Sequence, residues 1–350
     1  MSPSRGFASD NSSGAHPAIL AAIAAANHGH ATAYGGDSET ARLEETSAAI
    51  FGDRSRIFPM LNGTGANVAA LRAIARPHQA VICADTAHLT IDETAAPEAI
   101  AGLKLLGAPT PDGKLTPEIA SKKLADPADL PHAAWPAVVS ITQATELGTV
   151  YTPQEVGALS DFAHENGMRL HMDGARLANA AASLGLGLNE VSLGCGVDLL
   201  CLGANKNGAL FGEAVVFREP ELAEGFGVLR KGSLQLASKM RFVSAQLNAL
   251  IENELWRDLA GNANRMAAAL ADAVAWIDGV EIAQQTQANL VYVAMELEKA
   301  ERFVRGSAPH GPLLFRLGDS GLIRLVASWD TEMEDVDNLV TELRVAAHGH

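Results

Sequence analysis

Cysteine is scarce in this chain, where Cys83, Cys195 and Cys201 are the only three among 350 residues. Each stands singly in apolar surroundings, and no CxxC motif or Cys/His cluster accompanies them. This spacing excludes a disulfide-stapled scaffold and offers no pattern of metal ligands, so we expect no metal site. We interpret the three cysteines as reduced core residues of a cytoplasmic protein.

Long apolar runs and positive charge are also in short supply. No window approaches the roughly 20 apolar residues of a membrane span, and the opening stretch MSPSRGFASDNSSG lacks the apolar segment of a signal peptide. Acidic residues number 41 against 26 basic ones, which gives a formal net charge of −15. An acidic surface repels phosphate backbones. The sequence therefore predicts a soluble, cytoplasmic protein that binds neither membranes nor nucleic acid.

Short apolar runs alternate with helical patterns in the first two thirds of the chain. The runs typical of buried strands are 80–85, 137–142, 168–173 and 197–203. The segment 153–167 is typical of a helix, and Thr152 and Glu155 frame its start as a capping box. This alternation indicates an α/β fold, with a mostly parallel central sheet and helices on both of its faces.

The last third of the chain has a different pattern. Residues 239–277 form one long helical stretch, and a βαβ-like tail follows, with strands at 288–296 and 322–330. Thr331 and Glu334 are spaced to cap the last helix. We expect three parts: an N-terminal segment (1–30) that contributes to the functional site, a large α/β domain (31–245) and a small C-terminal α+β domain (246–350).

A glycine-flanked turn opens one of the predicted helices, in the stretch MLNGTGANVAALRAI. Gly63 precedes Thr64 there, and the free N–H groups and dipole of a helix start favour an anion such as phosphate. A plain tight turn is the alternative. The spacing to Asp85 imitates a dinucleotide fingerprint. However, Val68 occupies the third glycine position and Pro59 suits a central strand poorly, which disfavours a nicotinamide site.

Two polar residues follow predicted strands. Asp173 closes the run 168–173, and Lys206 follows the run 197–203. Ligands of open α/β sheets bind where the strands end. Burial lowers the pKa of an amine, and a neutral amine can attack a carbonyl group. Taken singly, a surface pair of Asp173 with Arg176 and a lysine that extends to solvent are the alternatives.

The three features together match the needs of pyridoxal phosphate. A lysine amine holds the aldehyde, a carboxylate keeps the pyridine nitrogen protonated, and a helix start receives the phosphate. His88 follows the strand 80–85 and could stack on the ring, with a core or surface histidine as the alternative. The sequence therefore predicts a pyridoxal-phosphate site in which Lys206, Asp173 and His88 are catalytic.

On these residues the chain resembles the threonine aldolases, and most of all their bacterial low-specificity and phenylserine-type branch. The stretches that carry the resemblance are FASDNSSG, TAYGGD, NGTGAN, ICADTAHLTIDE, GKLTP, ITQATELGTVY, LHMDGARLAN, GANKNG, QLASKMRF and ASWDT. The resemblance implies a fold-type-I transferase-like architecture. It also implies reversible cleavage of L-threonine, L-allo-threonine or a related β-hydroxy-α-amino acid, such as phenylserine, to glycine and an aldehyde.

The resemblance implies roles for single residues as well. Lys206 matches the Schiff-base lysine, Asp173 the partner of the pyridine nitrogen, and His88 the residue that stacks on the ring. Gly63 and Thr64 match the phosphate turn.

The substrate carboxylate is implied to bind a second group of residues. Ser9, Arg176 and Arg324 match this group, and Arg176 also counts among the cofactor-binding residues. A guanidinium suits the task because its planar fork pairs with a carboxylate in two bonds. Arg324 alternates with Ile323 and Leu325 along a strand, so an exposed strand arginine is the alternative.

Subunit contacts are implied too, because members of the family form tetramers built from dimers. The basic stretch 228–242 meets the phosphate of the neighbouring subunit in the family. Lys239 and Arg241 are both candidates for that contact, and Tyr34 is implied to reach the site across the interface. The expected assembly is a homotetramer with its active sites at subunit interfaces.

One departure from the family concerns the proton of the β-hydroxyl group. Many threonine aldolases carry a second histidine in the segment matching ITQATELGTVY, where this chain has Gln143 and Thr145. His88, a water molecule or the cofactor phosphate then remain as the base. The alternative activity is that of another fold-type-I enzyme, an aminotransferase or a β-eliminating lyase.

Overall fold

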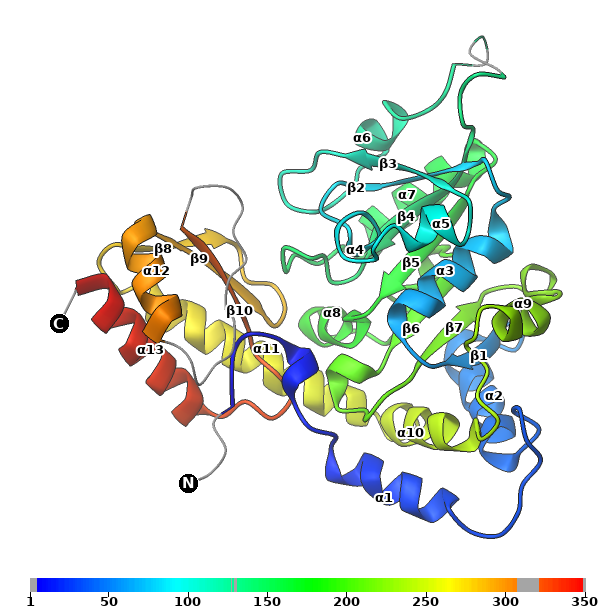
Figure 1. The fold of residues 1–350 in the computed structure, drawn as a ribbon, viewed down its shortest axis with the longest axis horizontal. Helices are drawn as coiled ribbons and strands as arrows, with labels where there is room; N and C mark the ends of the chain where they lie inside the picture. Colours follow the sequence, from blue (N-terminus) through cyan, green and yellow to red (C-terminus); the bar gives the residue numbers. More distant parts are fainter. Residues whose placement is uncertain (1–4, 127, 129–130, 307–320, 349–350) are drawn as a thin grey trace.

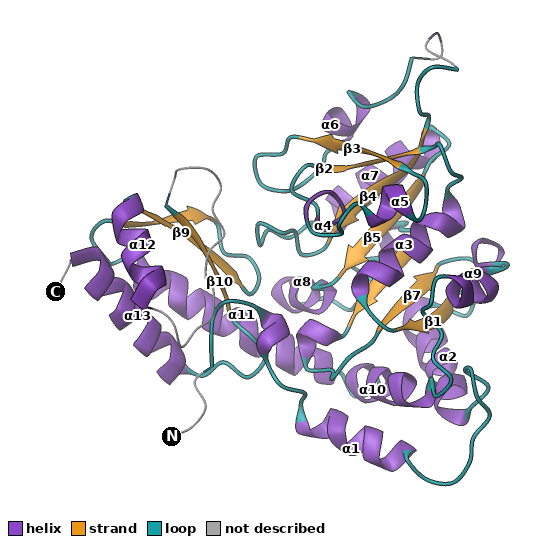
Figure 2. Ribbon diagram, viewed as in Figure 1, coloured by secondary structure: helices purple, strands orange, loops and turns teal. Residues whose placement is uncertain are grey.

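The computed structural model describes residues 5–126, 128, 131–306 and 321–348. A large unit contains a seven-stranded sheet, and a smaller C-terminal unit contains a three-stranded sheet. The two units lie side by side, and helix α11 (Leu255–Val274) runs from one to the other (Figure 1). Helices lie on both faces of the large sheet (Figure 2). This architecture confirms the predicted α/β fold with a small α+β unit after it.

The direction of its strands explains where the large sheet collects polar residues. The strands are β1 (Arg56–Met60), β2 (Ala80–Ala84), β3 (Lys104–Ala108), β4 (Pro136–Thr142), β5 (Arg169–Gly174), β6 (Leu199–Gly203) and β7 (Glu213–Phe217). They follow the order β1-β7-β6-β5-β4-β2-β3. The strands from β6 to β3 are mutually parallel, whereas β7 is antiparallel to both of its neighbours. All strands except β7 therefore end at one edge of the sheet, the carboxyl edge, and β7 begins there.

The sequence of each strand fits its place in the sheet. Every residue of β2 and β6 is buried, as expected for central strands of a parallel sheet with helices on both faces. Pro59 lies in β1, which is an edge strand. A proline lacks the N–H that a second neighbour would need, so an edge is where a sheet accommodates it.

The helices of the large unit connect and cover these strands. They are α1 (Pro17–Ala26), α2 (Ser38–Phe51), α3 (Gly63–Ile74), α4 (His88–Ile91), α5 (Ala96–Ala99), α6 (Pro117–Ser121), α7 (Pro153–Glu165), α8 (Leu177–Leu184), α9 (Phe226–Gly232) and α10 (Arg241–Ile251). The predicted capping box at α7 is present, because Thr152 Oγ1 accepts from the Glu155 N–H at 3.2 Å and Glu155 Oε2 accepts from the Thr152 N–H at 2.7 Å.

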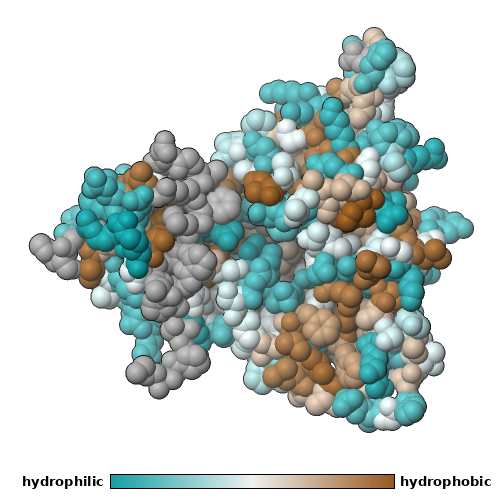
Figure 3. All heavy atoms as spheres, in the orientation of Figure 1, coloured by the Kyte–Doolittle hydropathy of each residue, from teal (hydrophilic) through white to brown (hydrophobic). Residues whose placement is uncertain are grey.

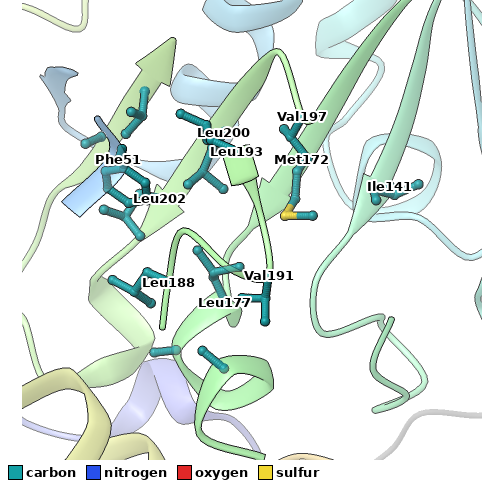
Figure 4. Close-up of a cluster of buried hydrophobic side chains, with 14 of the residues drawn as sticks. Phe51, Ile141, Met172, Leu177, Leu188, Val191, Leu193, Val197, Leu200 and Leu202 are labelled. Atoms are coloured by element: carbon teal, nitrogen blue, oxygen red, sulfur yellow. The ribbon is translucent and has the colours of Figure 1, made fainter. Parts of the chain in front are cut away.

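Alternation along the central strands separates the apolar core from the polar face. Met172 of β5 and Leu200 and Leu202 of β6 point into the apolar cluster drawn in Figure 4. Asp173, the next residue after Met172, points to the other face, where its carboxylate meets Asn67 of α3. This apolar cluster packs one face of the sheet against α7 and α8. On the opposite face, strands β6 and β7 pack against α3, and the polar residues collect where the strands end.

The small unit differs from the βαβ-like expectation. Its sheet has the order β10-β9-β8 and is antiparallel throughout. Its elements are β8 (Val280–Gln284), β9 (Leu290–Met295), α12 (Leu297–Gly306), β10 (Leu322–Val326) and α13 (Met333–His348). In strand β8, exposed positions alternate with a buried or half-buried position, but its sequence VEIAQ is too short and polar to stand out.

Two helix predictions in this region were wrong in detail. The stretch 239–277 is split into α10 and α11, because Glu254 takes a left-handed conformation with φ 53° between them. The Thr331 hydroxyl does not cap α13; it accepts from the Ser328 N–H at 2.8 Å. Asp335 caps this end instead, accepting from the Glu332 N–H at 2.8 Å.

The N-terminal segment touches both units. Phe7 is fully buried in the core of the small unit, and its carbonyl accepts from the Val326 N–H at 2.8 Å. The Gly14 carbonyl accepts from the Trp329 indole at 2.9 Å, and the His16 N–H donates to Gly208 O of the large unit at 2.8 Å. Among the described residues, no helix combines the length and apolarity needed to cross a membrane.

Candidate active site

Chain topology gathers polar residues at the carboxyl edge of the large sheet. Gly63 and Thr64 follow β1, His88 follows β2, and Asp173 ends β5. Lys206 lies in the 3₁₀ turn η4 (Asn205–Asn207) directly after β6. Because β7 runs the other way, its first residue, Glu213, reaches the same edge. All of these side chains line one cavity of about 180 Å³.

Lys206 is half-buried in this cavity. Burial is the main cause that lowers the pKa of its amine, and the nearby Arg176 guanidinium lowers the pKa further. The carboxylates that act in the opposite direction belong to Asp10, Asp173 and Glu213. An amine in this setting gives up its proton more readily than a solvent-exposed lysine, as the sequence predicts.

Asp173 is held by two hydrogen bonds. Its Oδ1 accepts from the Ala175 N–H at 2.9 Å, and its Oδ2 accepts from the Asn67 side-chain amide at 2.8 Å. Only 6% of the residue is exposed. The carboxylate is therefore fixed in orientation at the end of β5, as a partner for a ring nitrogen must be.

The turn before α3 presents backbone donors to the same cavity. Asn62 caps the helix, and its side-chain oxygen accepts from the Gly65 N–H at 2.8 Å. The amides of Gly63 and Thr64 belong to the first turn, which has no carbonyl partners within the helix. A Cβ atom at Gly63 would meet nothing within 4 Å, so space for a ligand lies beside it.

His88 opens α4 and is 35% exposed at its side chain. Its Nδ1 lies 2.9 Å from Glu93 Oε1, and its backbone N–H donates to Glu146 Oε1 at 2.7 Å. The hydrogen bond with Glu93 is the main cause that raises the pKa of the imidazole, while burial acts against it.

A second cavity of about 150 Å³ adjoins the first. Its lining includes three residues predicted to bind a carboxylate, namely Ser9, Arg176 and Arg324, together with Tyr292. Tyr292 pairs with Arg324 in the antiparallel register of β9 and β10. The residues that line both cavities are Asn11, His88, Glu146, Arg176 and Lys206.

Arg176 has a partner that sequence reasoning missed. Its Nε donates to Asp10 Oδ2 at 2.7 Å and its Nη2 donates to Asp10 Oδ1 at 2.9 Å, which is a two-bond pair. Asn289 also donates to Asp10, at 3.0 Å. Burial by itself would raise the pKa of Asp10, but Arg176 and Lys206 outweigh burial and lower the pKa. The quoted stretch FASDNSSG contained this residue without revealing its distant partner.

Three predicted residues are not brought into either cavity of this chain. Tyr34 is 51% exposed, and its ring lies 4.2 Å from the Lys231 ammonium. Lys239 is exposed, and Arg241 donates to the His28 carbonyl at 3.4 Å. Their assignment to a neighbouring subunit stays a prediction.

The two residues that replace the family's second histidine have structural partners. Gln143 is fully buried, and its amide bonds both backbone groups of Tyr151, at 2.8 and 3.0 Å. Thr145 bonds the Thr149 hydroxyl at 2.7 Å. Neither is among the lining residues, whereas Glu146 lines both cavities. Burial is the main cause that raises the pKa of Glu146.

Several other site residues escaped sequence reasoning. They are Asn11, Asn67, Glu93, Glu146, Asn205 and Glu213. Burial raises the pKa of Glu213 to about 7, and the Ala204 N–H donates to its Oε2 at 2.8 Å. The signal for Glu213 was a charged residue within an otherwise apolar run, ALFGEAVVF. The other five residues lie within the stretches that carry the family resemblance, where they were given no role.

Three ligand-type side chains lie close together in the first cavity. The nearest donor atoms of His88, Glu93 and Asp173 are within 4.8 Å of one another. Asn67 donates to both of these carboxylates, at 2.9 and 2.8 Å. The cluster therefore has the donors to hold a cation, but an amide already occupies the space between its two acidic members.

A half-buried lysine, a fixed carboxylate and a helix start with free backbone donors, at the carboxyl edge of a mostly parallel sheet, are features of the class of fold-type-I enzymes. The family model described as beta-eliminating lyase matches residues 6–296. Among curated proteins, the low-specificity L-threonine aldolase of Pseudomonas aeruginosa is 42% identical over 344 residues, with 97% of each chain covered. The enzyme of the same name from Pseudomonas sp. is 43% identical over 346 residues, again with 97% of each chain covered.

A solved structure agrees with these relatives. Threonine aldolase of Leishmania major superposes with a TM-score of 0.87 and 29% identity, covering 98% of this chain and 100% of that chain. The chain belongs to the beta-eliminating lyase family and, within it, to the threonine aldolases, which makes it an enzyme of the aldehyde-lyase class.

Proposed function

We propose that this chain cleaves L-threonine, L-allo-threonine and related L-β-hydroxy-α-amino acids, including phenylserine, reversibly to glycine and an aldehyde. The cofactor of the proposed reaction is pyridoxal 5′-phosphate. The observation that carries the proposal is the pair of adjoining cavities with Lys206 in the wall of both. One cavity has the groups for a cofactor, and the other has the groups for an amino-acid carboxylate.

The residues present fit pyridoxal phosphate. Asp173 faces the cavity with its carboxylate fixed, Gly63 leaves open space at the start of α3, and the Lys206 amine has a lowered pKa. When bound, the cofactor supplies an aldehyde for the lysine and an electron sink for the bond that breaks at Cα. Gly63 and Thr64 would hold its phosphate, Asp173 its ring nitrogen, and His88 would stack on the ring.

We assign the orientation of the substrate to residues that line the second cavity. Arg324 and Ser9 lie in its wall, and we assign the substrate carboxylate to them and to Arg176. Asp10 already occupies two donors of Arg176, so this guanidinium would be shared rather than free. Anchoring the carboxylate decides which Cα bond is aligned for cleavage, and misalignment costs rate because reacting orbitals lose overlap.

Product identification tests the activity. Purified protein loaded with the cofactor should convert threonine, allo-threonine and phenylserine to glycine plus acetaldehyde or benzaldehyde, measured by a coupled aldehyde reductase and by amino-acid analysis. Formation of a 2-oxo acid and ammonia instead would indicate a β-eliminating lyase, and transfer of the amino group would indicate an aminotransferase. Borohydride reduction followed by digestion should label the peptide that contains Lys206.

A homo-oligomer with active sites at its interfaces is also part of the proposal, and we place the protein in the cytoplasm. Apolar residues gather over α1 and α9 on the face shown in Figure 3. Large apolar side chains on these two helices or just after them are exposed, including Leu20 of α1 at 49%, Val228 of α9 at 81% and Leu234 after α9 at 83%. Such a patch suits a second copy of the chain. Lys239 or Arg241, and Tyr34, would then approach the neighbour's site.

We retain the proposed division into residues 1–30, 31–245 and 246–350. The main apolar cluster of the large unit and that of the small unit are separate, which supports this division. Helix α11 contributes to both, since Trp256 and Leu259 belong to the core of the large unit and Leu270 and Val274 to that of the small unit.

A further inference from the structure

Glu93 forms a buried link between two residues assigned to catalysis. Its side chain is 0% exposed. Its Oε1 lies 2.9 Å from His88 Nδ1 and accepts from the Asn67 amide at 2.9 Å. The same amide donates to Asp173 Oδ2 at 2.8 Å. A continuous path of hydrogen bonds therefore runs from the imidazole to the carboxylate at the end of β5.

This contact decides the tautomer of His88. An ionised carboxylate can only accept hydrogen bonds, so the ring nitrogen that faces Glu93 must carry the proton. Nδ1 is that nitrogen, which leaves the lone pair on Nε2. His88 lines both cavities, and a neutral imidazole whose Nε2 is unprotonated can take a proton from a substrate.

The charges around the imidazole also favour a stronger base. Glu93 and Asp173 raise the pKa of His88, whereas Lys206 and burial lower it. Glu146 accepts from the backbone N–H of His88 and fixes the start of α4. A raised pKa means that Nε2 holds a transferred proton more firmly, which helps its removal from a hydroxyl group.

We propose that Glu93 is the positioning residue of the β-hydroxyl base, holding His88 in the tautomer that leaves Nε2 free to accept the hydroxyl proton. This inference rests on the proposed aldol cleavage. It chooses His88 among the bases that the sequence left open. It also assigns a role to Glu93, which lies in the stretch ICADTAHLTIDE but was given no role there.

The proton transfer balances within the substrate. The O–H bond breaks and its proton passes to Nε2, while its electron pair becomes the second bond of the aldehyde carbonyl. The Cα–Cβ bond breaks, and its electron pair stays with Cα, which is later protonated to give glycine. Returning the proton from Nε2 restores neutral His88, so no oxidant or further reactant is needed.

A tautomer measurement on the cofactor-free protein tests the positioning role directly. Nitrogen-15 spectra of the imidazole should show His88 protonated at Nδ1 in the wild type. In Glu93→Gln the side-chain amide can donate to Nδ1, so the proton should move to Nε2 in a large fraction of molecules. Glu98→Gln, an exposed carboxylate five residues further on, is the matched control and should leave the tautomer unchanged. An unchanged tautomer in Glu93→Gln overturns the proposal.

Two reactions of the loaded enzyme separate this role from a structural one. Threonine cleavage needs the hydroxyl base, whereas exchange of the glycine α-proton with solvent deuterium does not. Glu93→Gln should lower kcat for cleavage by roughly 100-fold and leave exchange within about twofold. In Glu93→Asp, which restores the charge, cleavage should recover in part. Equal loss of both reactions, or no loss of either, contradicts the proposal.

The pH profile gives a third readout. Loss of Glu93 removes the main cause that raises the pKa of His88, so the acid limb of kcat/KM should move to lower pH in Glu93→Gln. A limb that stays in place would assign the base elsewhere. If the wild type produces no glycine from threonine, the proposed function fails, and the tautomer spectra still decide whether Glu93 positions His88.

Discussion

The two edges of the large sheet differ in how their buried carboxylates are paired with cations. The edge opposite the carboxyl edge, where β2, β4, β5 and β6 begin, is called the amino edge. At the amino edge, Asp198 is fully buried and accepts from His164 at 2.7 Å, Arg218 at 3.2 Å and Arg169 at 3.4 Å. The Leu170 N–H adds a bond at 2.9 Å. In this cluster, three cationic or cation-forming side chains therefore surround the one carboxylate of Asp198.

At the carboxyl edge the balance is reversed. Asp173, Glu93, Glu146 and Glu213 line the same cavity as two cations, Lys206 and Arg176. Burial raises the pKa of both Glu146 and Glu213. Glu93 Oε2 and Glu146 Oε2 are buried without a hydrogen-bond partner among the described residues. An excess of buried carboxylates over cations, with pKa values shifted by burial, is typical of sites where chemistry takes place, so we interpret the amino edge as stabilising and the carboxyl edge as reactive.

Of the substitutions at the two edges, removal of the Lys206 side chain should have the largest effect on activity. Lys206→Ala should abolish turnover and the absorbance of bound cofactor, because the covalent anchor is lost. The folding transition should shift little, since the amino edge is untouched. Steady-state assays, absorbance spectra and thermal unfolding check these points. Measurable turnover in this variant would remove the central assignment.

The carboxylate at the end of β5 should come next. Asp173→Asn keeps the shape of the side chain but cannot hold a ring nitrogen in its protonated form. We expect a loss of kcat on the order of 10²–10³, with much of the cofactor retained in the absorbance spectrum. A near-normal rate would mean that the carboxyl edge does not need this charge.

Arg324 should affect substrate affinity more than rate. Arg324→Ala removes a charge-assisted contact with the carboxylate, which is worth roughly 1.5–3 kcal/mol and corresponds to a rise in KM of about 10- to 100-fold. Initial rates over a range of threonine concentrations measure it. If KM is unchanged, the substrate carboxylate binds elsewhere.

The amino edge should respond in stability alone. Asp198→Asn leaves the half-buried His164 and Arg218 and the exposed Arg169 without their carboxylate. Losing these charge-assisted hydrogen bonds costs about 1–3 kcal/mol of unfolding free energy. Catalytic constants per folded molecule should stay within twofold. Chemical denaturation followed by fluorescence gives the free energy, and a drop in kcat would show that the two edges are coupled.

The smallest expected effect concerns the pH dependence of stability. Burial raises the pKa of Glu213 from its ordinary value of 4.5 to about 7 in the folded protein. Between pH 4.5 and pH 7, the folded protein therefore keeps a proton on this carboxyl group that the unfolded chain has lost. This group therefore opposes folding increasingly as pH rises towards 7. Between pH 5 and pH 8, Glu213→Gln should lose less stability than the wild type, by roughly 1–2 kcal/mol. Parallel curves would contradict the assignment.

Local patterns allowed much of this site to be predicted. Strand ends are encoded in short stretches, so Asp173 and Lys206 could be placed at one edge from the alternation of strands and helices alone. Gly63 was recognised as part of a helix start, but the strand before it, β1, was not among the predicted runs. The position of His88 followed from the same rule. Sheet order was not needed, because the ends of all parallel strands meet at one edge.

Contacts between distant residues could not be predicted in this way. Asp10 meets Arg176 across 166 positions, and Asn67 meets Asp173 across 106 positions. Glu213 reaches the site only because β7 reverses direction, and an apolar run does not reveal the direction of its strand. The small antiparallel sheet was misjudged for the same reason, since pairing direction depends on tertiary packing.

The path of the N-terminal segment has a practical consequence for engineering. From Phe7 to His16 it packs into one unit, pairs with Arg176 beside the reaction centre and then bonds the other unit. Deleting these residues would remove both the partner of Arg176, which belongs to the proposed carboxylate site, and the contacts that this segment makes with the two units. Directed evolution of this enzyme for new aldehydes should therefore keep residues 7–16 constant and diversify elsewhere.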